Sequence, residues 1–170
     1  MELVVLVDEQ NNILGTAPKD TVHTKNTPLH RAFSLFLFNS NKELLLTKRA
    51  STKKTFSDIW TNTVCGHVGP DESTIDAVRR RLKEELRLEG MDMKEVAPYR
   101  YRFADQNGVV ENEICPIFVA FSDLDPKPNP EEVGDWKWMD WEKFLQEIKI
   151  HPTIYSPWCI EGARLVKSFL

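Results

Sequence analysis

Two glutamates on one expected strand are the first residues whose spacing points to chemistry. Glu111 and Glu113 are two positions apart in the apolar stretch 109–121, and side chains at that spacing on a strand point to the same face. Two like charges among apolar neighbours are costly unless a cation or a proton lies between them. The pair therefore indicates a divalent metal site, with a solvated polar face of an edge strand as the plainer alternative.

Three histidines supply nitrogen ligands for such a metal. His23 and His30 flank a short loop, and His67 precedes an expected helix. With Glu111 and Glu113 they can form a shell of imidazole nitrogens and carboxylate oxygens, a mixed set that suits a divalent transition metal. The shell requires tertiary convergence, which spacing does not show, and a histidine taken alone is more often structural.

A cysteine two residues before His67 is a candidate for proton transfer. Cys65 lies in an expected turn, where helix-terminal amides and a nearby metal can shift its pKa from the usual value of about 8.5. A cysteine taken alone is more often a buried small hydrophobe. Cys115 and Cys159 complete the set, and no Cys-x-x-Cys pair occurs. We therefore expect no disulfides and a reducing, cytoplasmic compartment.

A loop and helix over residues 66–88 resemble a Nudix box, in which acidic side chains hold magnesium on a diphosphate. The matching positions are Gly66, Glu72, Arg80, Leu82, Glu84, Glu85 and Leu88. Arg81 stands where the box usually has a glutamate that takes part in hydrolysis, which argues against ordinary Nudix hydrolysis. Arg87 stands where the box has a glycine, so we expect the helix to end differently there. Arg81 and Glu85 are four apart and share a helix face.

The elements that must position these residues follow from the period of the apolar side chains. Steps of three and four residues from Ile75 to Leu86 predict a helix over 73–88, capped by Ser73. Further helices are expected over about 141–148 and after Ser156-Pro157. Expected strands are 2–8, 12–17, 33–38, 44–47, 99–103, 109–121 and 136–139. Mixed strands with few helices predict an α+β fold.

Length and composition limit the function classes. The 170 residues, 41% hydrophobic and 28% charged, predict one globular domain over 1–170. The formal net charge of -4 argues against a general nucleic-acid or membrane-surface binder, which needs a basic excess. The amino terminus lacks the basic and long apolar segments of a signal peptide or membrane span.

Taken together, these residues make the chain resemble type I isopentenyl diphosphate isomerases from about residue 4 to residue 158. The matching blocks are His23 with His30, residues 60–67 (Trp-Thr-Asn-Thr-Val-Cys-Gly-His), 99–102 (Tyr-Arg-Tyr-Arg), 111–116 (Glu-Asn-Glu-Ile-Cys-Pro) and 156–158 (Ser-Pro-Trp). These isomerases commonly carry arginine at the Arg81 position. The resemblance implies a Nudix fold, with mixed β-sheets sandwiched between helices.

The resemblance also implies roles for individual residues. One ion, Mn²⁺, Zn²⁺ or Mg²⁺, would be bound by His23, His30, His67, Glu111 and Glu113. A second, Mg²⁺ on the substrate diphosphate, would be held by Glu85. The catalytic pair would be Cys65 and Glu113, with Tyr101 supporting Glu113. The diphosphate would be gripped by Lys19, Arg49, Lys53 and Arg81.

The implied reaction moves the double bond of isopentenyl diphosphate, a small prenyl diphosphate, to give dimethylallyl diphosphate. It needs one proton added at one carbon and another removed elsewhere, with water kept away from a developing cation. Trp158 can stabilise that cation with its aromatic face. We hypothesise that Glu113 donates and the Cys65 thiolate accepts, the reverse assignment remaining open. No nucleic acid, membrane insertion or partner protein is expected, and a monomer is the default.

Two rival functions remain open at this stage. The box alone is compatible with a Nudix hydrolase of a nucleoside or prenyl diphosphate, which would release phosphate without moving a double bond. A noncatalytic metal- or nucleotide-sensing module would bind its ligand without turnover, and it leaves the pairing of Cys65 with Glu113 unexplained.

Overall fold

One central strand organises the molecule. The computed structural model describes residues 1–170, and β3 (His30–Phe38) pairs with five neighbours. It runs parallel to β9 (Val110–Ile114) and β10 (Ile117–Phe121) and antiparallel to the other three. All but one residue of β3 are buried. Burial on both faces explains why its sequence is a nearly continuous apolar run without alternation.

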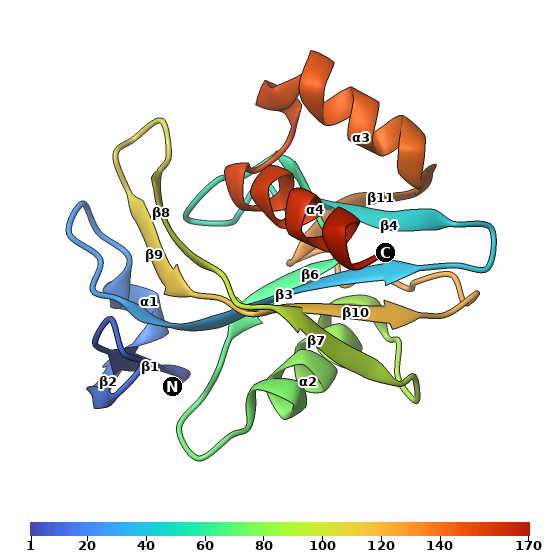
Figure 1. The fold of residues 1–170 in the computed structure, drawn as a ribbon. Helices are drawn as coiled ribbons and strands as arrows, with labels where there is room; N and C mark the ends of the chain where they lie inside the picture. Colours follow the sequence, from blue (N-terminus) through green and yellow to red (C-terminus); the bar gives the residue numbers. More distant parts are fainter.

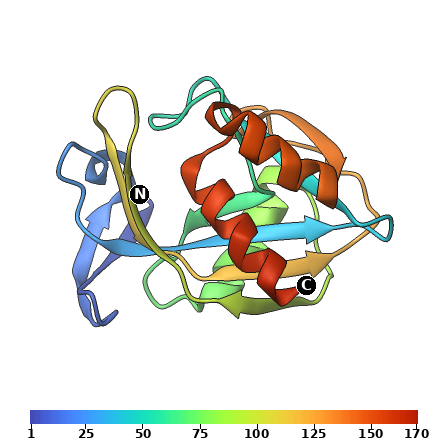
Figure 2. The ribbon, with the colours of Figure 1, turned by 45° about the horizontal axis from the view of Figure 1, so that its top comes forward.

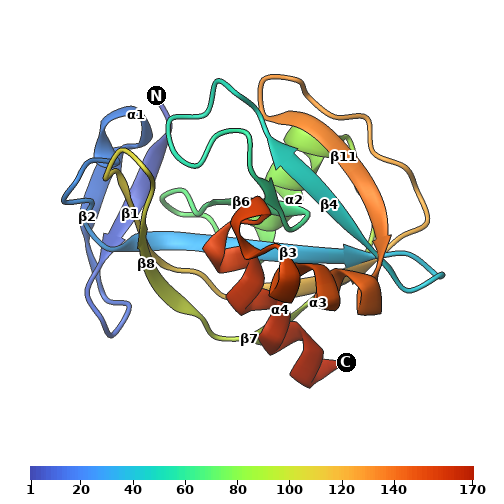
Figure 3. The same cartoon turned by 90° about the horizontal axis from the view of Figure 1, so that it is seen from above.

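The remaining strands extend this mixed sheet to eleven strands. They are β1 (Leu3–Val7), β2 (Ile13–Pro18), β4 (Glu43–Arg49), β5 (Trp60–Thr61), β6 (Val64–His67), β7 (Met93–Ala97), β8 (Arg100–Ala104) and β11 (Val133–Asp140). The hairpins β1–β2 and β8–β9 lie at the same end of β3 (Figures 1 and 3). That end of the sheet carries the histidines and glutamates singled out above.

Helices cover both faces of the sheet, as the α+β Nudix prediction requires. Helix α2 (Thr74–Leu86) lies on one face, and α3 (Trp141–Ile150) and α4 (Pro157–Phe169) lie on the other (Figures 1 and 2). One apolar core lies beneath α2, centred on Phe33 and Leu82, and a second lies beneath α3 and α4, centred on Phe36 and Phe144. Two short pieces complete the chain, α1 (Lys19–Val22) and a 3₁₀ turn, Pro152–Ile154. The helices are too short or too polar to span a bilayer.

The predicted helix boundaries are close to those observed. Ser73 caps α2, its hydroxyl accepting from the backbone of Asp76, and Ser156 caps α4 in the same way. The expected difference at Arg87 is wrong: Arg87 is the C-cap and adopts φ 58°, the left-handed conformation that glycine takes most easily. The helix therefore ends with the ordinary geometry, although a side chain occupies the position.

The predicted strand 109–121 is wrong in its continuity. It is two strands, β9 and β10, separated at Cys115–Pro116. Pro116 has no N–H for a ladder, and the break lets β9 pair with the start of β3 while β10 pairs with its later residues. The strands β5, β6 and β7 were not predicted; β5 and β6 have two and four residues, which carry too little periodicity.

Candidate functional site

Five predicted metal ligands converge at the end of β3. One ligand atom from each lies within 4.8 Å of all the others, the residues being His23, His30, His67, Glu111 and Glu113. Strand pairing explains the convergence: His30 is opposite Glu113 in the β3–β9 ladder, and His67 is opposite Ala32 in the β3–β6 ladder. His23 directly follows α1. The predicted clustering is confirmed, and the edge-strand alternative fails because β9 is paired on both sides.

The geometry of this shell fits a cation. The pyrrole-type nitrogen Nδ1 of His30 lies 2.8 Å from the Pro28 carbonyl, which makes Nδ1 the protonated atom and leaves Nε2 with a free lone pair. His30 Nε2, His23 Nε2 and Glu111 Oε2 are buried and have no hydrogen-bond partner. Burial lowers the pKa of His67 to about 4, which keeps this imidazole neutral. Buried lone pairs directed at one point are what a divalent metal requires.

Glu113 belongs both to this shell and to a second set of contacts. Its Oε1 lies 3.1 Å from His67 Nε2, and its Oε2 accepts a 2.6 Å hydrogen bond from the Tyr101 hydroxyl. Burial and the Glu113 charge raise the pKa of Tyr101. Tyr101 therefore stays a phenol and donates to a carboxylate.

Cys65 lies near Glu113 at the same cavity, on β6. Eleven residues line this cavity of about 50 Å³, among them both members of the predicted catalytic pair. The Cys65 thiol lies 3.3 Å from the Asn62 side-chain oxygen and 3.5 Å from the Ser34 hydroxyl. Burial raises the pKa of Cys65 to about 11, so the group is a thiol at neutral pH.

The wall of the cavity is aromatic on one side. Trp158, at the start of α4, is 2% exposed and stacks on Tyr101 with ring centroids 5.8 Å apart. Phe56 packs against it in a T-shaped arrangement with ring centroids 4.9 Å apart, and the Arg49 guanidinium lies 5.5 Å from its ring centroid. The serine cap and first-turn proline of α4 thus place an indole ring beside the proton-transfer candidates.

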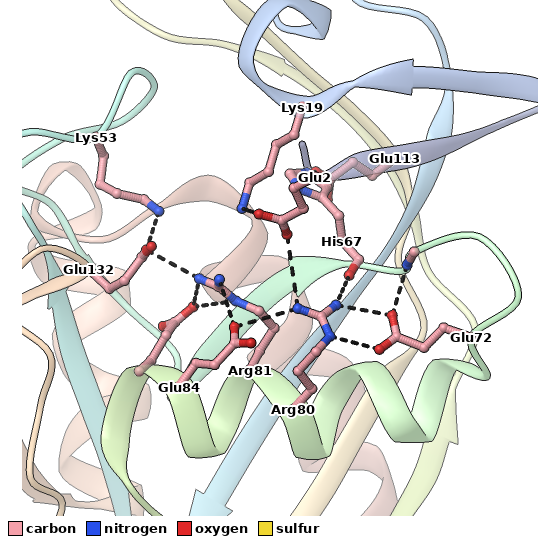
Figure 4. A network of polar contacts seen from close by, with 12 residues as sticks. Glu2, Lys19, Lys53, His67, Glu72, Arg80, Arg81, Glu84, Glu113 and Glu132 are labelled. Carbon is pink, nitrogen blue, oxygen red and sulfur yellow. Dashed lines mark hydrogen bonds and ion pairs between the residues drawn. The ribbon is translucent and has the colours of Figure 1, made fainter.

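The cavity is also lined by four cationic side chains, three of which are paired with carboxylates. Lys19, Lys53 and Arg81 line it together with Arg49. Lys19 pairs with Glu2 at 3.1 Å, and Lys53 pairs with Glu132, which also lies 3.2 Å from Arg81 (Figure 4). Arg81 contacts Glu85 as well, one turn further along α2. Four cationic side chains at one cavity provide donors of the kind that bind anions, and the carboxylates named above partly neutralise them.

Most predicted site residues lie at this one cavity or in the metal shell beside it. Glu85 is set slightly apart, at an adjoining cavity that Lys53 and Cys65 also line. Sequence reasoning missed Glu2 and Glu132, which neutralise the cationic side, and Thr55, whose hydroxyl bonds to Glu111. Glu2 and Thr55 belong to no box or period, and Glu132 follows the proline-rich stretch 125–130, so nothing in the sequence marked them.

The class of protein follows from the fold and from one family model. The NUDIX domain model matches residues 28–159. The crystal structure of a Deinococcus radiodurans protein has a TM-score of 0.78, with 22% identity over 96% of this chain and 98% of that one. A MutT protein of Methanosarcina mazei has a TM-score of 0.68, with 20% identity over 84% of this chain and 96% of the other. These likenesses establish the Nudix fold.

More similar relatives define the family within that class. An isopentenyl-diphosphate Delta-isomerase of Saccharopolyspora erythraea is 50% identical over 94% of this chain and 82% of its own length. Enzymes of the same name from Corynebacterium glutamicum strain R and Clavibacter sepedonicus are 46% and 47% identical, over 95% and 92% of this chain and 88% and 83% of their own lengths. The chain belongs to the isopentenyl-diphosphate Delta-isomerase family.

Proposed function

We propose that this protein interconverts isopentenyl diphosphate and dimethylallyl diphosphate by adding a proton at one carbon and removing one from another. The observation that carries the proposal is that Cys65 and Glu113 line one small cavity together with aromatic and cationic side chains. A carbon skeleton between a thiol and a carboxylate can exchange protons with both.

Each of the two groups is held by neighbours that suit proton transfer. Tyr101 fixes one oxygen of Glu113, and Asn62 and Ser34 contact the Cys65 sulfur. Because the reaction is reversible, the group that donates in one direction accepts in the other. The protonation states described above, a thiol at Cys65 and a carboxylate at Glu113, favour the reverse of the assignment hypothesised from the sequence, with Cys65 as the donor and Glu113 as the acceptor in the forward direction. Trp158 lies where its face can stabilise positive charge, by about 0.5 to 2 kcal/mol, and its bulk helps to exclude water.

Two metal ions are part of this proposal. The residues that would hold the first, Mn²⁺, Zn²⁺ or Mg²⁺, are His23, His30, His67, Glu111 and Glu113. Such a metal would polarise the Glu113 carboxyl group. Glu85, buried on α2, would help to hold Mg²⁺ on the substrate diphosphate, since that ion prefers oxygen ligands and retains phosphate contacts.

Substrate binding requires the cationic side of the cavity to open. A volume of about 50 Å³ is well below the roughly 300 Å³ at which ligand pockets begin. Lys53, Glu132 and Lys19 are each partly exposed, so their ion pairs can be exchanged for contacts to a diphosphate. Arg81 adds binding charge where hydrolytic Nudix enzymes carry a carboxylate, which protects an easily ionised allylic diphosphate from a water-activating group.

The direct test is incubation with isopentenyl diphosphate and Mg²⁺, followed by detection of the acid-labile allylic product. Cys65→Ala and Glu113→Gln should each lower kcat by several orders of magnitude while the fold is retained. Cys159→Ala is the matched control, because Cys159 is a buried residue of α4 in a different core cluster from the one that Cys65 packs against. Phosphate release without isomerisation would support a hydrolase instead, and full activity in either site variant would refute the assignment.

The proposal also covers the cellular compartment and the oligomeric state of the protein. We place the protein in the cytoplasm, because all three cysteines are free thiols and such thiols persist in a reducing compartment. We also propose a monomer acting on a small prenyl diphosphate, which size-exclusion chromatography with light scattering can test.

A further inference from the structure

Thr55 is a buried hydroxyl in the loop that joins β4 to β5, and the reaction proposed above does not use it. Its side chain is almost completely enclosed, with the residue 4% exposed. Its Oγ1 donates a hydrogen bond to Oε1 of Glu111. Thr52, three residues earlier, is exposed and contacts only the backbone of Glu131, at 3.4 Å.

The bond from Thr55 decides how the Glu111 carboxylate is turned. With Oε1 held by the hydroxyl, Oε2 faces the ligand cluster, 3.1 Å from Nε2 of His23. Oε2 is buried and has no hydrogen-bond partner. A free carboxylate would rotate to satisfy that oxygen, so the hydroxyl of Thr55 keeps one oxygen available to a cation. Outer contacts of this kind orient metal ligands and raise their affinity for the ion.

The backbone of Thr55 is hydrogen-bonded to a residue that lines the cavity. The Arg49 guanidinium donates to the Thr55 carbonyl at 3.0 Å and to the Phe56 carbonyl at 3.1 Å. Arg49 and Phe56 both contact the ring of Trp158. The loop from Ala50 to Ile59 also carries Lys53, on the cationic side of the cavity. Thr55 thus stands between the metal ligands and the segment that shapes the substrate cavity.

We propose that Thr55 is a positioning residue that orients Glu111 toward the metal and ties the 50–59 loop to the occupied metal site. Thr55 acts through Glu111 and touches no reacting atom. The inference rests on the proposed function in one respect only, namely that the shell around His23, His30 and His67 holds a metal. It predicts that metal binding and loop order change together when the hydroxyl is removed.

Three variants separate the hydroxyl from the rest of the side chain. Thr55→Val keeps the shape and removes the donor, Thr55→Ser keeps the donor, and Thr52→Val removes a hydroxyl from the same loop away from the site. The dissociation constant for Mn²⁺ is measured by calorimetry and by the electron paramagnetic resonance signal of free Mn²⁺. Thr55→Val should weaken Mn²⁺ binding about 10- to 100-fold, whereas the other two variants should bind like the parent.

Loop order supplies a readout that is independent of catalysis. Hydrogen exchange of amides in residues 50–59 should slow when Mn²⁺ is added to the parent or to Thr55→Ser, and should respond much less in Thr55→Val. Circular dichroism before metal addition checks that each variant is folded. Thr55→Ala, which also lacks the donor, replaces Thr55→Val if the valine variant does not fold.

The outcomes distinguish this inference from the proposed function. Parent-like Mn²⁺ affinity in Thr55→Val would overturn the role of Thr55, as would a Thr55→Ser variant as weak as Thr55→Val. A parent chain that binds neither Mn²⁺ nor Zn²⁺ would overturn the metal shell and Thr55 together. Normal metal binding with the predicted weakening in Thr55→Val, but without isomerase activity, would refute the proposed function and leave the role of Thr55 intact.

Discussion

Removing the Tyr101 hydroxyl tests whether Glu113 works as a positioned proton-transfer group. Tyr101→Phe deletes the donor that lies 2.6 Å from Glu113 Oε2. The ring remains packed between Phe103, at 5.3 Å, and Trp158, at 5.8 Å. A hydrogen bond to a charged group contributes about 1.5 to 3 kcal/mol. If that contribution is realised in the transition state and not in the bound ground state, its loss lowers kcat about 10- to 150-fold, since about 1.36 kcal/mol is a tenfold change in rate.

A neighbouring tyrosine provides the control for that experiment. The Tyr99 hydroxyl donates to Glu161 at 2.5 Å, also a carboxylate, but away from the cavity. Tyr99→Phe should therefore cost a similar free energy of unfolding, a fall in Tm of about 3 to 12 °C, and leave kcat unchanged. Steady-state kinetics and thermal melts on both variants separate the two effects. Equal kcat for Tyr101→Phe and the parent would refute the reasoning, as would an equal loss in Tyr99→Phe.

Three further predictions follow from the same geometry. Chelation should lower Tm by about 5 to 11 °C at a metal concentration of about 100 Kd, because an ion bound only by the native state adds about 2.7 kcal/mol; an unchanged melt would argue against a tightly held ion. Arg87→Gly should raise the free energy of unfolding by about 0.5 to 1 kcal/mol in urea titrations, because glycine adopts the left-handed φ of 58° without strain. A lower free energy of unfolding would mean that the Arg87 side chain contributes more stability than the relieved strain returns. The rate of Cys65 alkylation by iodoacetamide, followed by peptide mass mapping, should rise about tenfold per pH unit up to about pH 11, since only the thiolate reacts. A plateau near pH 8 would show that burial does not raise the pKa of this thiol.

The sequence predicts the parts of this fold in which a periodic pattern is long enough to be recognised. The 73–88 helix is predicted within two residues because its apolar positions recur over several turns and Ser73 marks the start. Strand β6 has four residues, including Gly66 and His67, and shows no alternation. The division of 109–121 depends on which part of β3 each half pairs with. That information is tertiary and is absent from local spacing.

The site residues also fall into two groups, those that a local sequence pattern predicts and those that it does not. Glu111 and Glu113 are predicted to share a face because a two-residue step on a strand requires it. Their convergence with three histidines follows from ladder registers that only the folded sheet defines. Thr55 and Glu132 reach the site from loops, where neither period nor box applies. Loop residues that support a ligand are therefore the part of an active site least accessible to sequence reasoning.

The cationic side chain of Arg81 and the metal-ligand shell lie close together at the cavity because a glycine stands between them on β6. Gly66 follows Cys65 and precedes His67 on β6, and a Cβ at this position would lie 3.0 Å from both Arg81 Cγ and the Phe33 ring. Arg81 therefore passes directly over the strand that carries the thiol and a metal ligand. A carboxylate at position 81 would bring negative charge beside Glu85 and Glu132, which already share the Arg81 guanidinium. Arginine at this position keeps the cavity cationic beside the glutamates of β9, which suits the diphosphate binding proposed above without a hydrolytic carboxylate at position 81.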